Sequence, residues 1–410
     1  MPPADQSAAD DVDVPALELS ASLPPVADTD DALTEVVASV AAGSGPIAID
    51  AERASGYRYS SRAYLLQLRR AGSGTALIDP IPFGELPTLG AVIGDEEWVL
   101  HAATQDLPCL AQLGLRPVSL FDTELGGRLL NLPRVGLASL VQELIGRSLA
   151  KEHSAVDWST RPLPEPWLLY AALDVEVLLE LRDLVEARLT DAGKLQWAQQ
   201  EFAALTRFAG PPARTEPWRR TSGIHRARGR RSLGVVRELW EARDQLAADL
   251  DVAPGRLLTD SAIVEIATTL PATRASLRSL PTVRHRNARR HLDGWEEALD
   301  RGRALSEDAL PTLGQRYDGP PPARAWAEKD PVAAARLAAC RQGVSEVAAD
   351  HDLPVENLLA PDAVRRLAWE PPAPLDHAAV AAALEGYGAR PWQVQLTAGV
   401  LTAALDDTAD

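Results

Sequence analysis

The sequence predicts an α/β domain in its N-terminal half, followed by two small all-α domains. Short apolar runs typical of strands lie between residues 47 and 100, and longer helical patterns dominate after residue 106. A run of strands followed by a run of helices is the order expected of this architecture. The length of 410 residues is also too great for one ordinary core, so two or three domains are expected.

The first strands follow an acidic N-terminal segment. Residues 1–27 show no periodic apolar pattern, which predicts a disordered acidic tail. Asp30 or Asp31 is expected to cap a helix that runs to Val40 and ends at the glycines and proline of residues 43–46. Four apolar runs then predict strands, at residues 47–49, 64–68, 75–78 and 97–100.

Helical patterns complete the α/β domain. They occupy residues 106–113, 122–130, 137–145 and 166–189, and the domain is expected to span residues 28–205. The break at Gly210, Pro211 and Pro212 and the arginine-rich segment after it predict a basic linker over residues 206–230.

The remainder of the chain contains an internal repeat. Residues 247–258 and 348–359 align without gaps and share Ala, Ala, Asp, Asp, Leu and Leu at six positions. Each copy follows an Arg-bearing helix, so a duplicated helical domain is favoured over a chance likeness of two Ala-rich turns. The predicted copies span residues 231–305 and 329–410, and a proline-containing linker over residues 306–328 separates them.

The charge distribution is more informative than its sum. A formal net charge of −17 argues at first against a nucleic-acid partner, because phosphate binding needs Lys and Arg. However, no Lys or Arg precedes Arg53, whereas the arginine-rich windows at residues 207–231 and 272–292 contain Glu216 as their single acid. Such windows are compatible with RNA binding and equally with an ordinary solvated surface.

Cysteine content and hydropathy indicate the compartment. Cys109 and Cys340 are the only cysteines and lie far apart, which argues against a disulfide framework and a cysteine-rich zinc site. The acidic N-terminal segment lacks the basic and apolar regions of a secretory signal. No apolar run approaches the roughly 20 residues of a membrane span. We therefore expect a soluble cytoplasmic protein, with its oligomeric state open.

Three carboxylates lie close to predicted strand ends. Asp50 and Glu52 follow the strand at residues 47–49, and the strand period places both side chains on one face. Asp106 follows the strand at residues 97–100 and begins a helix. Taken alone, each pattern is more often a solvent-facing strand end or a helix cap than a functional site.

A fourth carboxylate lies on a predicted helix. Tyr170 and Asp174 are one helical turn apart in an apolar stretch, so both project from one face. Burying a carboxylate is costly without a partner, and a metal ion would supply one; the alternative is a partly exposed Asp beside a core tyrosine. Hard oxygen ligands favour Mg²⁺ or Mn²⁺ over zinc. Two such ions about 4 Å apart can activate a water and stabilise the leaving oxygen of a phosphodiester.

At these residues the chain resembles the ribonuclease D family, which belongs to the DEDD exonuclease superfamily and has a tyrosine in its third motif. Asp50 and Glu52 match the first motif, residues 101–106 the second, and Tyr170 with Asp174 the third. Lys151, Ser154 and residues 157–163 resemble the segment that precedes the third motif. The two helical repeats resemble the HRDC domain, which helicases share with ribonuclease D.

The resemblance implies an RNase H-like fold with a mixed sheet and stepwise 3′-to-5′ hydrolysis that releases nucleoside 5′-monophosphates. It implies that Asp50 bridges two divalent ions, Mg²⁺ or Mn²⁺, and that Glu52 and Asp174 complete the water-bearing site. Asp106 would hold the second ion, and Tyr170 would orient the attacking water. The implied partners are RNA 3′ ends, including those of tRNA precursors, in tRNA processing or RNA turnover.

The chain departs from the family at two positions beside the first motif. Ala51 stands where the family often has Thr, and Arg53 where an apolar residue is common. Neither change removes a ligand, but contacts to the terminal nucleotide are expected to differ. His101, Trp158 and Arg161 are further candidates for substrate contact, and each has packing as an equal alternative.

Two other functions remain open from sequence. One is a 3′-to-5′ DNA exonuclease that uses the same site, because the active-site motifs do not distinguish RNA from DNA. The other is a non-catalytic nucleic-acid-binding protein whose helical repeats carry the function. Retention of all four carboxylates and Tyr170 argues against the second, since binding does not need them.

Overall fold

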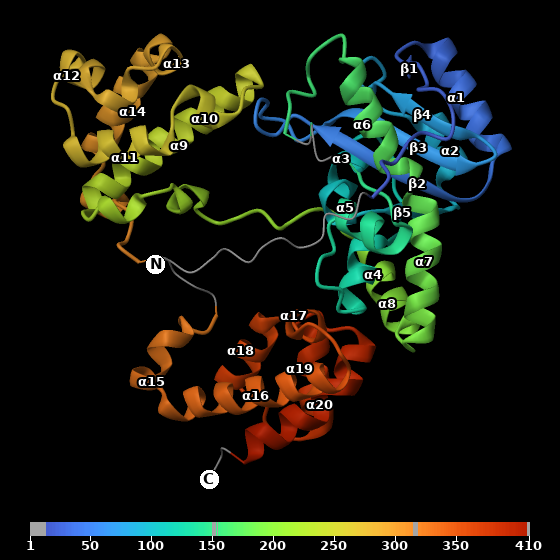
Figure 1. The fold of residues 1–410 in the computed structure, drawn as a ribbon. Coiled ribbons are helices and arrows are strands. Elements are labelled where there is room, and N and C mark those ends of the chain that lie inside the picture. The colour runs from blue at the N-terminus through green and yellow to red at the C-terminus, as the bar shows by residue number, and fades with distance from the viewer. Residues whose placement is uncertain (1–13, 150–152, 154, 315–318, 408–410) are drawn as a thin grey trace, which may run out of the picture.

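The protein consists of a sheet-containing domain and two helical regions (Figure 1). The structure, a computed structural model, describes residues 14–149, 153, 155–314 and 319–407. Lys151 and Ser154 lie outside these residues. Among the described residues, no helix is long and apolar enough to cross a membrane.

The α/β domain is built on a mixed sheet, as the family resemblance implied. Its strands are β1 (Val26–Ala27), β2 (Ser44–Arg53), β3 (Ala63–Ala71), β4 (Gly74–Ile78), β5 (Glu97–Leu100) and β6 (Ser119–Asp122). Within the described chain they lie in the order β1-β4-β3-β2-β5-β6. The β2–β3 and β3–β4 pairs are antiparallel, and the β1–β4, β2–β5 and β5–β6 pairs are parallel.

Helices cover this sheet. They are α1 (Asp30–Ala42), α2 (Pro87–Ile93), α3 (Leu107–Gln112), α4 (Thr123–Leu129), α5 (Leu137–Leu140), α6 (Glu165–Glu176), α7 (Leu178–Asp191) and α8 (Leu195–Leu205), and a π-helical turn, Val141–Ile145, continues α5. Helix α6 packs over β2, β3 and β4, where Ala171 and Ala172 join Leu65 and Leu77 in a buried cluster. Small alanines let the helix approach the sheet closely, and this contact fixes the residues on its next turn.

Several boundaries differ from the sequence-based expectation. Thr29, rather than Asp30 or Asp31, caps α1 by accepting a hydrogen bond from the Ala32 amide, and the two aspartates occupy the first turn. Strand β2 begins at Ser44, inside the predicted break, because Gly45 adopts a left-handed φ of 73° and the strand continues beyond it. The long helix predicted at residues 166–189 is interrupted at Val177.

The prediction of a disordered tail is wrong for residues 14–27. Val26 and Ala27 form β1 and pair with β4, and the Ser20 amide donates to Glu176 at 3.1 Å. Leu19 and Leu23 pack against the cluster under α6. The apolar residues here are too widely spaced to show a period, but they are enough to hold one extended segment against the domain.

Two helical regions follow. The first contains α9 (Arg230–Leu250), α10 (Pro254–Leu257), α11 (Asp260–Thr269), α12 (Arg274–Ser279), α13 (Arg286–Arg290) and α14 (Leu292–Ala304). The second contains α15 (Trp326–Lys329), α16 (Pro331–Asp350), α17 (Val355–Leu358), α18 (Pro361–Trp369), α19 (His377–Gly386) and α20 (Pro391–Asp406).

Parts of both predicted linkers belong to these helical regions. Trp218 is 2% exposed and lies in the core of the first region together with Ala227. Trp326 is fully buried and packs on Trp369 with ring centroids 4.8 Å apart. Each predicted linker thus contains a buried tryptophan that belongs to a helical region. The connecting segments are therefore shorter than the predicted linkers at residues 206–230 and 306–328.

The repeated sequence segment has the same conformation in both regions. Asp251 and Asp352 follow α9 and α16 with left-handed φ values of 46° and 49°. The next residue in each copy donates its amide back to the helix, Val252 to Ala247 at 3.0 Å and Leu353 to Ala348 at 2.8 Å. A one-turn helix, α10 or α17, then begins. The shared residues therefore encode a shared turn.

Candidate active site

Six of the eight predicted site residues converge on one cavity of about 410 Å³ at the carboxyl ends of β2 and β5. Its lining includes Asp50, Glu52, His101, Asp106, Tyr170 and Asp174. Parallel strands β2 and β5 end at the same edge of the sheet, which brings the first two motifs together. Helix α6 crosses this edge and adds the third.

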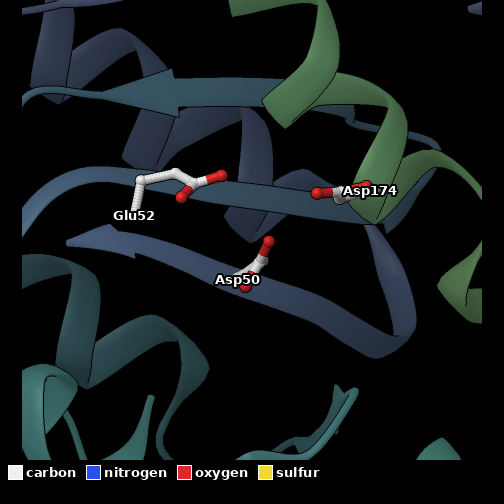
Figure 2. Close-up of side chains that lie close together, drawn as sticks. All are labelled: Asp50, Glu52 and Asp174. Carbon is white, nitrogen blue, oxygen red and sulfur yellow. The ribbon is translucent and has the colours of Figure 1, made fainter. Parts of the chain in front are cut away.

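Three of the four carboxylates form a tight group. Oxygens of Asp50, Glu52 and Asp174 lie within 4.8 Å of one another, and Figure 2 shows the three side chains turned toward a common space between β2 and α6. Asp50 and Glu52 share a face of β2, as their spacing predicted. The Ala51 amide donates to Asp50 at 2.9 Å, which fixes that carboxylate.

The cluster is electrostatically unfavourable without a cation. Burial, followed by the charges of Asp50, Asp174 and Asp106, raises the pKa of Glu52 to about 10. Burial and the Asp50 charge also hold the pKa values of Asp106 and Asp174 well above the ordinary range. Several oxygen donors that repel one another in a dry site are the donor set that a divalent ion such as Mg²⁺ satisfies. The residues present therefore fit a metal.

Asp106 lies on the second side of the cavity. It precedes α3 at the helix-cap position, yet its side chain makes no capping hydrogen bond and is 5% exposed. Helix capping therefore does not explain the presence of an acid at this position, and the carboxylate is available to bind a ligand in the cavity. Its Oδ1 lies 3.9 Å from a guanidinium nitrogen of Arg53.

A residue that the sequence analysis missed shapes this side of the cavity. Asp122, at the end of β6, is 2% exposed and accepts hydrogen bonds from the Ala102 and Ala103 amides at 3.1 and 2.8 Å. It also caps α4 by accepting from the amides of Glu124 and Leu125. One carboxylate thus fixes both the start of α4 and the tight turn before Asp106. An Asp between an apolar strand and a helical pattern was the available signal.

Tyr170 lies beside Asp174 on α6. Burial and the Asp50 charge raise the pKa of Asp174, and the nearby Tyr170 hydroxyl lowers it by a smaller amount. Burial, together with the Asp174, Glu52 and Asp50 charges, raises the pKa of the Tyr170 phenol. The phenol therefore stays protonated and can only orient other groups by hydrogen bonding.

His101 lines the cavity as a neutral ring. The Thr123 hydroxyl donates to the Leu100 carbonyl at 3.2 Å, so at the 2.9 Å contact it must accept from His101 Nδ1. Burial lowers the pKa of His101 to about 4. Its Nε2 is then left as a hydrogen-bond acceptor, and the ring adds no positive charge.

Trp158 and Arg161 lie in packed and hydrogen-bonded positions, in line with the packing alternative. Trp158 is fully buried beneath α6, with its ring centroid 6.5 Å from that of Tyr170. Arg161 bonds Asp79 at 2.5 and 2.8 Å and also donates to the Tyr64 carbonyl. Neither residue lines the cavity. Both residues hold the segment that precedes α6, and a direct contact with substrate stays a prediction for each.

Three domain families match the chain. A 3′-5′ exonuclease domain matches residues 25–190, the HRDC domain residues 232–299, and a 3′ to 5′ exonuclease C-terminal domain residues 319–405. Ribonuclease D of Gluconacetobacter diazotrophicus is 32% identical over 335 residues, which cover 79% of this chain and 81% of the relative.

The chain belongs to the ribonuclease D family.

Solved structures agree with this assignment. A crystal structure of a protein from Bifidobacterium adolescentis aligns with a TM-score of 0.88 at 37% identity, covering 96% of this chain and 99% of that one. Escherichia coli RNase D, described as an exoribonuclease involved in structured RNA processing, aligns with a TM-score of 0.67 at 26% identity over 93% of this chain and 98% of its own.

Membership of the ribonuclease D family makes the chain a 3′-to-5′ exoribonuclease, a phosphodiester hydrolase. The HRDC expectation is confirmed for the first helical region. The second region matches a different domain family, so its HRDC-like character stays a prediction that rests on the shared turn. The mixed sheet followed by helical regions is confirmed as the fold class.

Proposed function

We propose that the enzyme shortens RNA from its 3′ end and releases nucleoside 5′-monophosphates at the cavity lined by Asp50, Glu52, Asp106 and Asp174. The observation that carries this proposal is the carboxylate cluster: three acids within 4.8 Å, with a fourth on the same cavity and a neutral phenol beside them. Binding alone would not need so costly a group.

Each carboxylate has a proposed task. Asp50, Glu52 and Asp174 would hold one divalent ion, and Asp106 together with Asp50 would hold a second. Mg²⁺ or Mn²⁺ bound there supplies the positive charge that lowers the pKa of a water and stabilises the leaving oxygen. The proposal that Asp50 would serve both ions is supported by its place in the group of three and by the effect of its charge on Asp106.

Tyr170 and His101 are proposed to orient rather than to transfer protons. The Tyr170 hydroxyl, which lines the cavity together with Asp174, can accept a hydrogen bond from the attacking water and fix its direction. His101 stays neutral above about pH 4, and its Nε2 can accept from a ribose hydroxyl or a water. We propose no proton abstraction by either residue.

The proposed substrates are the 3′ ends of structured RNA, including tRNA precursors, in the cytoplasm. The description of the E. coli relative as acting in structured RNA processing supports the substrate class. The free thiols of Cys109 and Cys340, both buried, are compatible with a reducing compartment.

A 5′-labelled single-stranded RNA tests the proposal. The wild type should shorten it progressively with Mg²⁺ or Mn²⁺ and lose this activity with a chelator, and Asp50→Ala should be inactive. Asp95→Ala is a matched control, because Asp95 is exposed at the opposite edge of the sheet, before β5. An inactive wild type with both metals would contradict the proposal, and preference for a matched DNA strand would favour a DNA exonuclease.

A further inference from the structure

Arg53 occupies an unusual place at the end of β2. Strand pairing passes from Glu52–Leu65 to Arg53–Ala63 and skips Tyr64, so the regular alternation of side chains is broken between Glu52 and Arg53. A register shift of this kind re-aims a side chain. Arg53 consequently lines the same cavity as the carboxylates, with 29% of its side chain exposed.

The Arg53 guanidinium is only loosely held. Its Nη2 donates to Gln105 Oε1 at 3.5 Å and lies 3.9 Å from Asp106 Oδ1, and within the described chain no other polar partner is present. Arg161, by comparison, makes two short bonds to Asp79 and three to carbonyl oxygens. A guanidinium has five N–H donors, so most of those on Arg53 remain available for a ligand.

The charge balance of the cavity gives this cation a role. Arg53 is the single Lys or Arg among the described residues that line it, opposite four carboxylates. Two divalent ions would balance the four negative charges of the carboxylates, so the charge of an entering phosphodiester would have no counter-charge left over among the described lining residues other than Arg53. Arg53 then supplies the remaining positive charge, on a planar group that matches two phosphate oxygens.

We propose that Arg53 binds the scissile phosphate of the RNA, and that it turns from Asp106 to this phosphate once a divalent ion occupies the Asp106 carboxylate. The inference rests on the proposed function. Arg53 is then a substrate-binding residue at a position where the family often has an apolar side chain. Without substrate, Arg53 competes with the metal ion for the Asp106 carboxylate.

Adenosine 5′-monophosphate is a suitable probe, because it carries the phosphate and is not consumed. Calorimetric titration into the Mn²⁺-loaded enzyme should give an affinity that falls about tenfold to a hundredfold in Arg53→Gln, the loss expected for a charged hydrogen bond. Arg53→Lys should recover part of the affinity. Adenosine, which lacks the phosphate, should bind wild type and Arg53→Gln equally.

Arg116→Gln is the matched control. Arg116 is exposed beside the amino end of β6, at the sheet edge opposite Asp106, and its loss removes the same charge without touching the cavity. Titration of Mn²⁺ without nucleotide gives a second readout: Arg53→Gln should bind the metal at least as tightly as wild type, because a competing cation is gone.

Two results would overturn the inference. One is an affinity for adenosine 5′-monophosphate that changes less than twofold in an Arg53→Gln protein whose melting temperature matches wild type. The other is an equal loss for adenosine, which would assign Arg53 to the nucleoside. Failure of the proposed function is distinguishable, since it appears as a wild type that does not shorten RNA, whatever the nucleotide affinities are.

Discussion

Asp251 and Asp352 occupy equivalent positions in the two helical regions, and each bonds its own region to the exonuclease domain. Asp251 Oδ1 accepts from the Ser60 amide at 2.9 Å, and Asp352 Oδ1 accepts from Asn131 Nδ2 at 2.6 Å. Lys194 also donates to the Asp352 carbonyl at 2.8 Å. The repeat detected in the sequence is therefore a duplicated docking turn.

Asp251→Ala should loosen the first helical region. It removes the acceptor for Ser60 and Tyr64 and places a residue with no local hydrogen bond at a φ of 46°. Asp251→Asn should behave closer to wild type, because Asn keeps the acceptor and tolerates this φ. Limited proteolysis at residues 206–216 provides the measurement. Asp249→Ala, which removes only a bond to Gln245, is the control, and equal cleavage of all variants would refute the docking role.

His101 should make stability depend on pH between about 4 and 6.5. The pKa of His101 is about 4 in the folded chain, below its ordinary value of 6.5. Between these pH values His101 is therefore protonated in the unfolded chain and neutral in the folded chain. Stability therefore falls as pH falls through the window, by on the order of 3 kcal/mol for the full shift. His101→Gln should flatten this part of the curve in urea unfolding. An unchanged slope would show that His101 titrates normally.

Tyr170→Phe should reduce kcat about tenfold to a hundredfold and leave KM nearly unchanged, because the phenol orients a water but holds neither metal nor RNA. Steady-state shortening of a labelled RNA measures both constants. Tyr59→Phe, at an exposed position bonded to Asp244, is the control. A Tyr170→Phe enzyme with wild-type kcat would exclude the proposed orientation.

Divalent ions should stabilise the protein more as pH rises. Glu52 has a folded pKa of about 10 against an ordinary 4.5, so between these values the metal-free folded state keeps a proton that the unfolded state has released. Metal-free stability therefore falls as pH rises through this window. A bound ion replaces the proton, and the increase in melting temperature with Mn²⁺ should be larger at pH 8 than at pH 6. A pH-independent increase would place the ion elsewhere.

The site could be predicted largely from sequence because its spacings are local. Asp50 and Glu52 are linked by the strand period, and Tyr170 and Asp174 by one helical turn. The two pairs lie far apart in the sequence and come together only in the folded chain, and it was the family resemblance that implied this proximity. The role of Asp122 was missed because its four amide partners lie on two separate segments, which only the folded β5–β6 pair brings together.

Short edge elements account for most of the missed fold. Strand β1 has two residues and gains its register from β4, and β6 has four residues that the helical pattern after Asp122 concealed. The end of α6 at Val177 carries no glycine or proline to mark it. In each case tertiary contacts, rather than propensity, decide the boundary.

Anomalous diffraction from a crystal grown with Mn²⁺ and adenosine 5′-monophosphate would locate the metal ions themselves. We expect two manganese peaks roughly 4 Å apart, one contacting Asp50, Glu52 and Asp174 and the other contacting Asp50 and Asp106. The phosphate should lie against both peaks. No peak within the carboxylate cluster, at a Mn²⁺ concentration that supports RNA shortening, would contradict the assignment of these residues as the metal site.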